Sequence, residues 1–264
     1  MKLYYWSPFI SKIATEKAVI NSIKSVTKFS KEKISPYLLD IIGEWDLQKK
    51  DLINNNIKII DLLNFKLSKY LPKYGFLKSR FSYIVVFFFS IFKLHKMLKK
   101  EKPEYLMIHL MTFIPLLLLL FFNYETKFIL RISGYPKLNY LRSFFWKIVG
   151  KKIYLITTPT FSTLDLLNKF EIFDIDKIKY LPDPILNIDE ITKKKLDNNI
   201  SNKELFKEKT IISIGRLTKQ KNFEFLIKAF NKIMDEYPNF SLLILGEGEK
   251  RKTLEILIKK LNLD

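Results

Sequence analysis

The chain has 264 residues, of which 48% are hydrophobic and 15% aromatic, so it can bury a sizeable core and disorder is not expected. It contains no cysteine, which excludes disulfides and thiolate metal sites, and its two histidines would make a zinc site poor in ligands. The formal net charge of +19 favours anionic partners: nucleic acid, phosphorylated small molecules or an acidic membrane surface. The lysines are spread along the whole chain, as is typical of solvated faces.

Strand-like and helix-like segments alternate along the first two thirds of the chain. The expected strands cover 2–6, 37–42, 57–63, 104–109, 127–132, 153–157 and 177–181. The expected helices cover about 12–26, 77–100, 113–122, 137–149 and 162–170. This alternation predicts an α/β fold with a parallel, doubly wound sheet. The N-terminus lacks the basic start, apolar run and cleavage site of a signal peptide, which predicts a cytoplasmic protein.

Residues 188–208 are charged and show no steady period, which predicts a linker with some helix. The alternation then restarts with a strand at 210–214, a helix at 222–236, a strand at 240–245 and a helix at 249–261. We therefore expect one domain over 1–187, a linker over 188–208 and the first part of a second domain over 209–264. A unit of about 55 residues with two strands is less than a mononucleotide-binding half requires, so we expect a C-terminally truncated sequence.

Two apolar segments raise the question of a membrane. The run 83–92 is too short to cross a bilayer of about 30 Å, whereas 106–122 is nearly long enough. A buried strand followed by a buried helix is favoured for 106–122, because strand signals resume on both sides. The alternative function is a membrane-associated, non-enzymatic protein with a buried or spanning segment at 83–122. The aromatic, lysine-rich segment 77–100 is compatible with contact to an anionic membrane surface. The alternative interpretation is that its aromatic residues pack in the core and its lysines are solvated.

The stretch from Ile211 to Phe223 contains the strongest local pattern. An apolar β-branched run ends at Gly215, a basic loop follows, and apolar residues then recur at helical spacing from Phe223. A strand, a turn with Arg216 and Lys221, and a helix N-terminus together make a place for a phosphate, since N–H groups and cations both attract the anion. An ordinary βα turn with solvated basic residues explains the same spacing equally well.

A family resemblance rests on two motifs. Ile214-Gly215-Arg216-Leu217-x-x-x-Lys221-Asn222, with Leu245-Gly246-Glu247-Gly248-Glu249-Lys250-Arg251 downstream, resembles the opening of the C-terminal domain of GT-B glycosyltransferases of the GT4 (group 1) family. Upstream, three features occupy the places of comparable elements in that family's N-terminal domain: His109 after an apolar strand, Arg131-Ile132-Ser133-Gly134, and Leu181-Pro182-Asp183-Pro184-Ile185. The resemblance is strong from about 177 onward and looser before.

The resemblance implies a GT-B fold of two Rossmann-like domains, the second incomplete here. It also implies a retaining, metal-independent transfer from a nucleotide-diphosphate sugar to a cell-envelope glycan or a lipid-linked acceptor. The nucleotide sugar would be a co-substrate, no further cofactor or metal would be needed, and the chain offers no recognition module for a specific nucleic acid. The enzyme would work in the cytoplasm or at the inner face of the cytoplasmic membrane, in peripheral contact with anionic lipid.

On the donor side, the resemblance places Gly215, Arg216 and Lys221 at the diphosphate. It places Gly246, Gly248 and Arg251 near the nucleotide, with Gly248 letting the backbone approach the ligand. For Arg251, an exposed residue in the first turn of a helix is the favoured interpretation over assistance at the nucleotide.

On the acceptor side, the resemblance assigns His109 to the transferred sugar or the acceptor near the reacting centre, as the catalytic candidate. A satisfied core histidine is the alternative. Arg131, Ser133 and Gly134 would face the acceptor, unless Arg131 pairs with a carboxylate instead.

The chain departs from the family pattern in two places. The loop 7–12 contains no glycine, where many members carry a Gly-rich loop after the first strand. The family's Glu-x7-Glu element, whose carboxylates hold the donor sugar and ribose, would come after residue 264. We therefore expect the 264-residue chain by itself to have little or no transferase activity.

Overall fold

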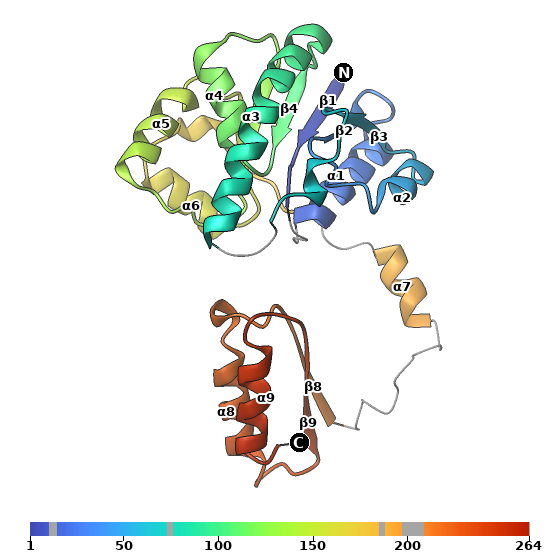
Figure 1. Cartoon of the computed structure of the whole chain (residues 1–264), viewed down its shortest axis with the longest axis vertical. Helices are drawn as coiled ribbons and strands as arrows, with labels where there is room; N and C mark the ends of the chain where they lie inside the picture. Colours follow the sequence, from blue (N-terminus) through green and yellow to red (C-terminus); the bar gives the residue numbers. More distant parts are fainter. Residues whose placement is uncertain (11–14, 73–75, 185–187, 197–208, 264) are drawn as a thin grey trace. The chain divides into compact units, whose positions relative to one another are not determined.

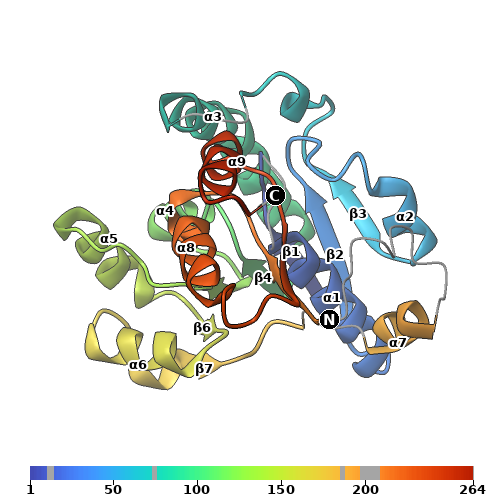
Figure 2. The same cartoon turned by 90° about the horizontal axis from the view of Figure 1, so that it is seen from below.

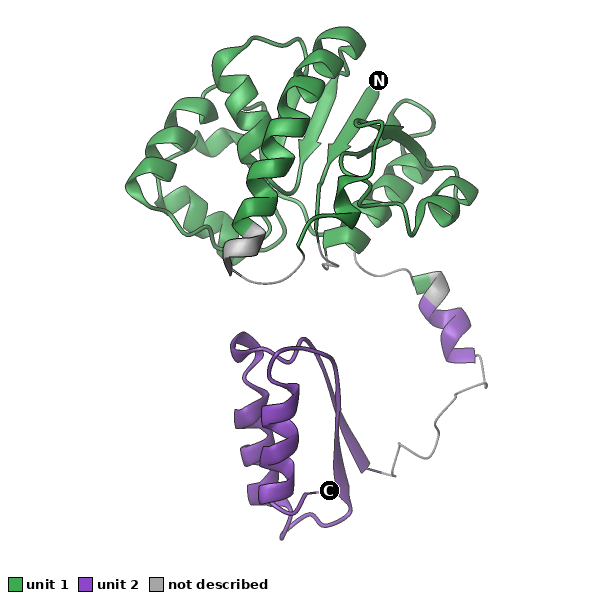
Figure 3. Cartoon of the chain, in the orientation of Figure 1, with its two compact units in different colours: residues 1–188 green, residues 189–264 purple. Residues whose placement is uncertain are grey.

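The computed structural model describes residues 1–10, 15–72, 76–184, 188–196 and 209–263 (Figure 1). The chain divides into two compact units, Met1–Ile188 and Asp189–Asp264 (Figure 3). This division falls next to the end of the first domain expected from sequence. The expected linker contains a helix, α7 (Ile188–Leu196), and its remaining residues, 197–208, lie outside the described ranges.

Unit 1 is organised around a seven-stranded sheet in the order β3-β2-β1-β4-β5-β6-β7, in which all neighbouring strands are parallel. The strands are β1 (Lys2–Trp6), β2 (Ser35–Asp40), β3 (Lys58–Asp61), β4 (Tyr105–Ile108), β5 (Lys127–Arg131), β6 (Leu155–Thr158) and β7 (Ile178–Tyr180). Because the strand order reverses between β1 and β4, their carboxyl ends form the topological switch point, where open α/β sheets bind ligands. The predicted doubly wound parallel sheet is confirmed.

The helices of unit 1 can be followed in Figure 1 and, from below, in Figure 2. They are α1 (Thr15–Phe29), α2 (Lys49–Asn54), α3 (Phe76–Glu101), α4 (Phe113–Phe121), α5 (Tyr140–Gly150) and α6 (Phe161–Lys169), with short 3-10 turns η1 (Leu67–Lys69) and η2 (Ile175–Lys177). Sequence analysis missed α2, because six largely polar residues are too few to show a helical period.

Side chains of the central strand β1 alternate between two hydrophobic cores. Leu3 and Tyr5 pack in one core with Val19 of α1 and Leu52 of α2. Tyr4 and Trp6 belong to the other core, which α3, α4, α5 and α6 cover. The helices therefore lie on both faces of the sheet, as the period of two along a strand requires when both faces are buried.

The segment 106–122 is part of the core of unit 1. It forms β4, which pairs with both β1 and β5, and then α4. Leu106, Ile108 and Leu116 are fully buried. The buried alternative for this segment is thus confirmed, and the membrane-span alternative is wrong here.

Helix α3 is longer than the apolar run 83–92 that sequence analysis judged too short for a bilayer. Within the described residues, Arg80–Glu101 is the one helical segment long and apolar enough to cross a membrane, judged by length and composition alone. However, α3 buries every fourth residue, at Ser82, Val86, Ser90, Leu94 and Leu98, against the core. This spacing is typical of a helix that lies on a sheet and leaves its outer face uncovered.

Unit 2 pairs two parallel strands, β8 (Lys209–Ile214) and β9 (Phe240–Leu245), with two helices. The helices are α8 (Phe223–Ile233), preceded by the 3-10 turn η4 (Lys219–Lys221), and α9 (Arg251–Lys260). A small core gathers around Leu217, Phe223, Ile227 and Leu254. The strand–helix–strand–helix order predicted for this part is confirmed.

Candidate functional site

His109 follows β4 directly and lies at the switch point of the unit 1 sheet. Its backbone N–H donates to the carbonyl oxygen of Trp6 at 2.9 Å, which ties the end of β4 to the end of β1. Its ring stacks on Tyr5, with ring centroids 6.0 Å apart and ring planes 24° apart. His109 therefore lies at the carboxyl edge of the sheet, where open α/β sheets bind ligands.

The His109 side chain is buried and has no hydrogen-bond partner in the described part of the chain. The residue is 7% exposed, and neither ring nitrogen has a partner among the described residues. The pKa of His109 falls from 6.5 to about 3, because burial disfavours the charged ring and because the Arg131 cation lies nearby. The ring is buried as in a core histidine, but among the described residues neither nitrogen has the hydrogen bond that the core alternative requires. At neutral pH the ring is uncharged and can donate one hydrogen bond and accept another.

Further unpaired polar atoms are buried at the same edge of the sheet. Ser7 follows β1, and Thr157 and Thr158 end β6; each hydroxyl is buried and has no hydrogen-bond partner among the described residues. Buried polar groups are paired in the great majority of cases, so their gathering at this edge indicates a place for a polar ligand. Sequence analysis missed these residues, although their position at the ends of predicted strands was a usable signal.

Arg131, at the end of β5, pairs with a carboxylate. Its Nη2 lies 2.6 Å from Oδ1 of Asp183, and its Nη1 donates to the carbonyl oxygen of Leu181 at 2.5 Å. The side chain is 1% exposed, so the structure shows the second of the two alternatives considered for this residue. Ser133 and Gly134 follow in an exposed loop, and a Cβ added to Gly134 would meet nothing within 4 Å. The structure ties neither of them to the buried polar edge.

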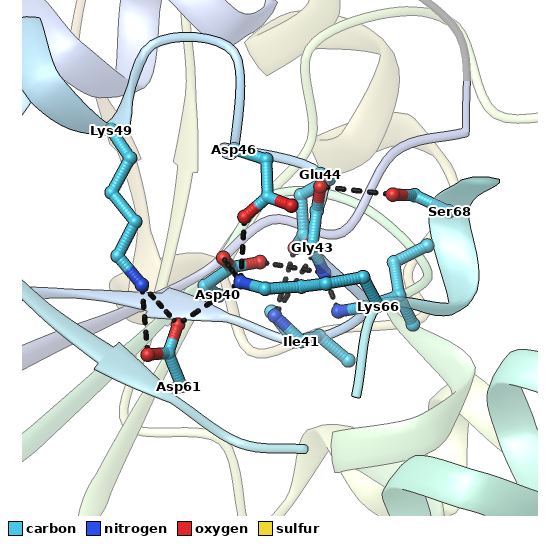
Figure 4. Close-up of polar contacts among 10 residues, drawn as sticks. Asp40, Ile41, Gly43, Glu44, Asp46, Lys49, Asp61, Lys66 and Ser68 are labelled. Atoms are coloured by element: carbon cyan, nitrogen blue, oxygen red, sulfur yellow. Dashed lines mark hydrogen bonds and ion pairs between the residues drawn. The ribbon is translucent and has the colours of Figure 1, made fainter. Parts of the chain in front are cut away.

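A charged cluster joins the carboxyl ends of β2 and β3 (Figure 4). Lys66 Nζ lies 2.6 Å from Asp46, 3.4 Å from Asp40 and 3.7 Å from Asp61. Lys49 lies 2.7 Å from Asp61 on the other side. These contacts raise the pKa of Lys66 despite its partial burial. The sequence did not predict this cluster, in which three carboxylates surround two ammonium groups and hold two loops together.

Glu44 is buried within the same loop. Its carboxylate accepts the backbone N–H groups of Ile41 and Ile42, while Asp40 accepts the N–H of Gly43, whose φ is +83°. Burial and the neighbouring Asp40 carboxylate raise the pKa of Glu44 well above 4.5. The described ranges contain no group of three or more His, Cys, Asp or Glu residues arranged to hold a metal ion.

The two turns at the carboxyl ends of β8 and β9 contact each other through their backbones. The N–H of Gly215 donates to the carbonyl of Leu245 at 3.0 Å, and the N–H of Leu217 donates to Glu247 at 2.9 Å. The N–H of Lys250 in turn donates to Leu217 at 2.9 Å. The two motifs that carry the family resemblance are thus neighbours in space.

The glycines of the second motif serve this close packing. A Cβ on Gly246 would lie 1.9 Å from the carbonyl oxygen of Gly215, and one on Gly248 would lie 2.4 Å from that of Leu217. Both distances are too short for any side chain. The structure thus gives Gly248 a role in the contact between two loops, and its expected approach to a nucleotide stays a prediction.

The basic side chains of these two loops differ in whether they form ion pairs. Arg216 and Lys221 are exposed, and no ion pair in the described part of the chain involves either. Arg251 is held between Glu247 and Glu255, as suits an exposed residue of the first turn of α9. Lys250, which sequence analysis did not single out, lies 3.8 Å from Glu224 in the first turn of α8. Arg216 and Lys221, with the exposed Lys219 between them, therefore make the loop after β8 basic, and no ion pair among the described residues neutralises them.

Part of the chain matches a known protein family, and curated relatives match more of it. Residues 197–264 match the family model of glycosyl transferases group 1. An uncharacterized glycosyltransferase of Methanocaldococcus jannaschii is 30% identical over 254 residues, which cover 89% of this chain and 57% of that protein. The N-acetylgalactosamine-N,N'-diacetylbacillosaminyl-diphospho-undecaprenol 4-alpha-N-acetylgalactosaminyltransferase of Campylobacter jejuni is 28% identical over 170 residues, 61% of this chain and 44% of that protein. The chain thus spans about half the length of the curated relatives it matches.

A solved structure shares the fold over the whole chain. HepE of Anabaena, in complex with UDP and glucose, matches with a TM-score of 0.63 and covers 100% of this chain and 67% of its own. Its sequence identity is 12%, so this likeness speaks for the fold alone.

Proposed function

We propose that the chain is a group 1 glycosyltransferase of the GT-B fold and that it transfers a sugar from a nucleotide-diphosphate sugar to an acceptor hydroxyl. The observation that carries the proposal is the pair of exposed cations, Arg216 and Lys221, on the loop after β8. A departing nucleoside diphosphate gains negative charge, which these cations stabilise. Arginine binds phosphate oxygens bidentately and lysine acts as a point charge, so a metal ion is not needed for this step.

For the acceptor side we assign the reacting centre to the buried polar edge of unit 1. The neutral His109 ring can accept a hydrogen bond from a sugar or acceptor hydroxyl and donate another. Arg131 acts as a positioning residue, since it fixes the segment 181–183 and, in addition to burial, helps to lower the pKa of His109. We propose a retaining transfer, with Ser133 and Gly134 as further predicted acceptor contacts.

We propose a lipid-linked acceptor or another cell-envelope glycan. The name of the Campylobacter relative specifies a diphospho-undecaprenol-linked substrate, which supports this class. The net charge of +19 and the exposed aromatic residues of α3 support a peripheral place at the inner face of the cytoplasmic membrane. High salt would release such a protein from membranes, because salt screens its attraction to anionic lipid.

The donor site is tested by UDP binding to the full 264-residue chain, measured by isothermal titration calorimetry. Arg216→Gln and Lys221→Gln should each weaken UDP by about 10- to 100-fold, since a hydrogen bond to a charged group contributes about 1.5–3 kcal/mol. The matched control is Lys219→Gln, which removes the same charge from an exposed residue of the same loop. It should change the affinity by less than about twofold, because long-range charge effects are screened. Equal losses in all three variants, or unchanged UDP binding by Arg216→Gln, would refute the assignment.

A further inference from the structure

Unit 1 contains a pocket of about 660 Å³ between α3 and the turn from β4 into α4. Ile84 and Phe88 line it from α3, and Ile114 lines it from α4. The turn is tight, with Met111 in the left-handed region at φ 45°. Most of the wall is hydrocarbon, which suits an apolar ligand better than a sugar.

Besides Tyr83 and Thr112, which carry hydroxyl groups, two nitrogen-bearing side chains interrupt this apolar lining. One is His109, which is nine-tenths buried and has no hydrogen-bond partner among the described residues. The other is Arg142, at the start of α5, whose guanidinium lies 5.9 Å from the centre of the Trp146 ring. One of its N–H groups donates to the carbonyl oxygen of Lys137 at 2.8 Å, and no described carboxylate neutralises it. The pocket therefore combines hydrocarbon walls, an exposed cation and an unsatisfied neutral imidazole.

The outer face of α3 continues the apolar lining onto the surface. Phe81, Ile84, Phe88 and Phe92 are 59%, 54%, 65% and 77% exposed and follow one another at helical spacing. The last turns of the same helix carry Lys93, Lys96, Lys99 and Lys100. Aromatic residues followed by lysines on one helix match an anionic lipid surface, where the rings enter the interface and the ammonium groups meet lipid phosphates.

We propose that this pocket binds the hydrocarbon chain of a lipid phosphate taken from an anionic membrane, with Arg142 at the phosphate and the polar end of the lipid directed to His109. The inference rests on the proposed function and names its acceptor class. A soluble glycan does not fit these observations, because its hydroxyl groups need many hydrogen-bonding partners and the pocket offers hydrocarbon. The membrane supplies the lipid, and the exposed face of α3 lies next to the opening through which it enters.

Farnesyl phosphate, used below its micelle concentration with the full chain, is the probe. Burying one further methylene improves affinity roughly fourfold, so farnesyl phosphate should bind at least about 100-fold more tightly than dimethylallyl phosphate. Ile84→Arg should weaken farnesyl phosphate at least about tenfold, since it places a charge at the apolar wall. The matched control is Ile53→Arg on α2, whose exposure of 55% equals the 54% of Ile84 and whose helix packs on the other core of the sheet.

Arg142→Gln tests the phosphate contact separately. It should weaken farnesyl phosphate about tenfold and leave the uncharged farnesol unchanged, because only the phosphate interacts with the guanidinium. Equal losses in Ile84→Arg and Ile53→Arg, no preference for the longer chain, or no effect of Arg142→Gln would each overturn the proposal.

UDP titrations of the same preparations separate this inference from the proposed function. Ile84→Arg should bind UDP as the wild type does. UDP binding that depends on Arg216, without farnesyl phosphate binding, would overturn the lipid pocket and leave the transferase function standing. The reverse pattern would leave a lipid-phosphate pocket and refute the donor site.

Discussion

Replacing His109 should remove one specific loss of stability that unit 1 suffers at acid pH. In the folded protein, burial beside Arg131 lowers the pKa of His109 from 6.5 to about 3. Below pH 6.5 the unfolded chain binds a proton at this position that the folded chain does not bind. Proton binding therefore lowers the free energy of the unfolded state relative to the folded state as the pH falls, and stability is lost between pH 6.5 and pH 3.

The size of the stability loss follows from the shift in the pKa of His109. Each pH unit in this window costs about 1.4 kcal/mol, so about 2.7 kcal/mol should be lost between pH 6.5 and pH 4.5. His109→Phe keeps a planar ring against Tyr5 and lacks the titrating group. It removes two buried nitrogens that have no partner among the described residues, so little hydrogen bonding is lost at neutral pH. His109→Gln is a second variant, in case the larger ring does not fit.

Urea unfolding at pH 7, 5.5 and 4.5 provides the measurement. Trp6, Trp45 and Trp146 are the only tryptophans and all belong to unit 1, so their fluorescence follows that unit alone. Relative to the wild type, the variants should gain about 1.4 kcal/mol by pH 5.5 and about 2.7 kcal/mol by pH 4.5, since all other titrations are common to both. A constant difference across this range would refute the reasoning. So would an NMR titration in which the His109 ring becomes protonated near pH 6.

Two further predictions concern the loops. Glu44→Gln removes a carboxyl whose pKa is raised above 4.5 by burial and Asp40, so the folded wild type holds a proton that the unfolded chain releases. The variant should therefore become more stable than the wild type as the pH rises above about 4.5, by the same urea assay; a gain that is largest at acid pH would contradict the raised pKa. Gly248→Ala places a Cβ 2.4 Å from the carbonyl oxygen of Leu217 and should destabilise unit 2 by about 1–3 kcal/mol, seen as faster hydrogen exchange of β8 amides. Gly134→Ala, where a Cβ meets nothing within 4 Å, is its matched control and should leave the exchange unchanged.

The fold was predictable because its elements have local signals. The apolar residues of α3 and α8 recur at helical spacing, and β1, β5 and β9 are short apolar runs bounded by polar or turn residues. These signals were enough for strand and helix order in both units. They failed for α2, whose six residues cannot show a period, whereas the helix expected at 77–100 is confirmed as α3.

The candidate site was predictable only in part. The glycine and cation pattern around Gly215 and Gly246 is local, so the two loops after β8 and β9 could be recognised without coordinates. The partner of each charged side chain was not predictable. Arg131 pairs with Asp183, 52 positions further along the chain, and no local sequence pattern near either residue predicts that contact.

The sequence by itself therefore determined the alternation of strands and helices, the resemblance to one family and the loop that carries Arg216 and Lys221. Only the tertiary structure decided which strand ends meet, and hence that His109 lies beside β1, with no partner for its ring nitrogens among the described residues and with its pKa lowered. It also decided that Arg131 is neutralised and that an apolar pocket opens beside His109. The physical reason is the separation in sequence of the residues involved. Backbone periodicity depends on neighbouring residues, whereas burial, ion pairing and cavities depend on groups that the fold brings together from distant parts of the chain.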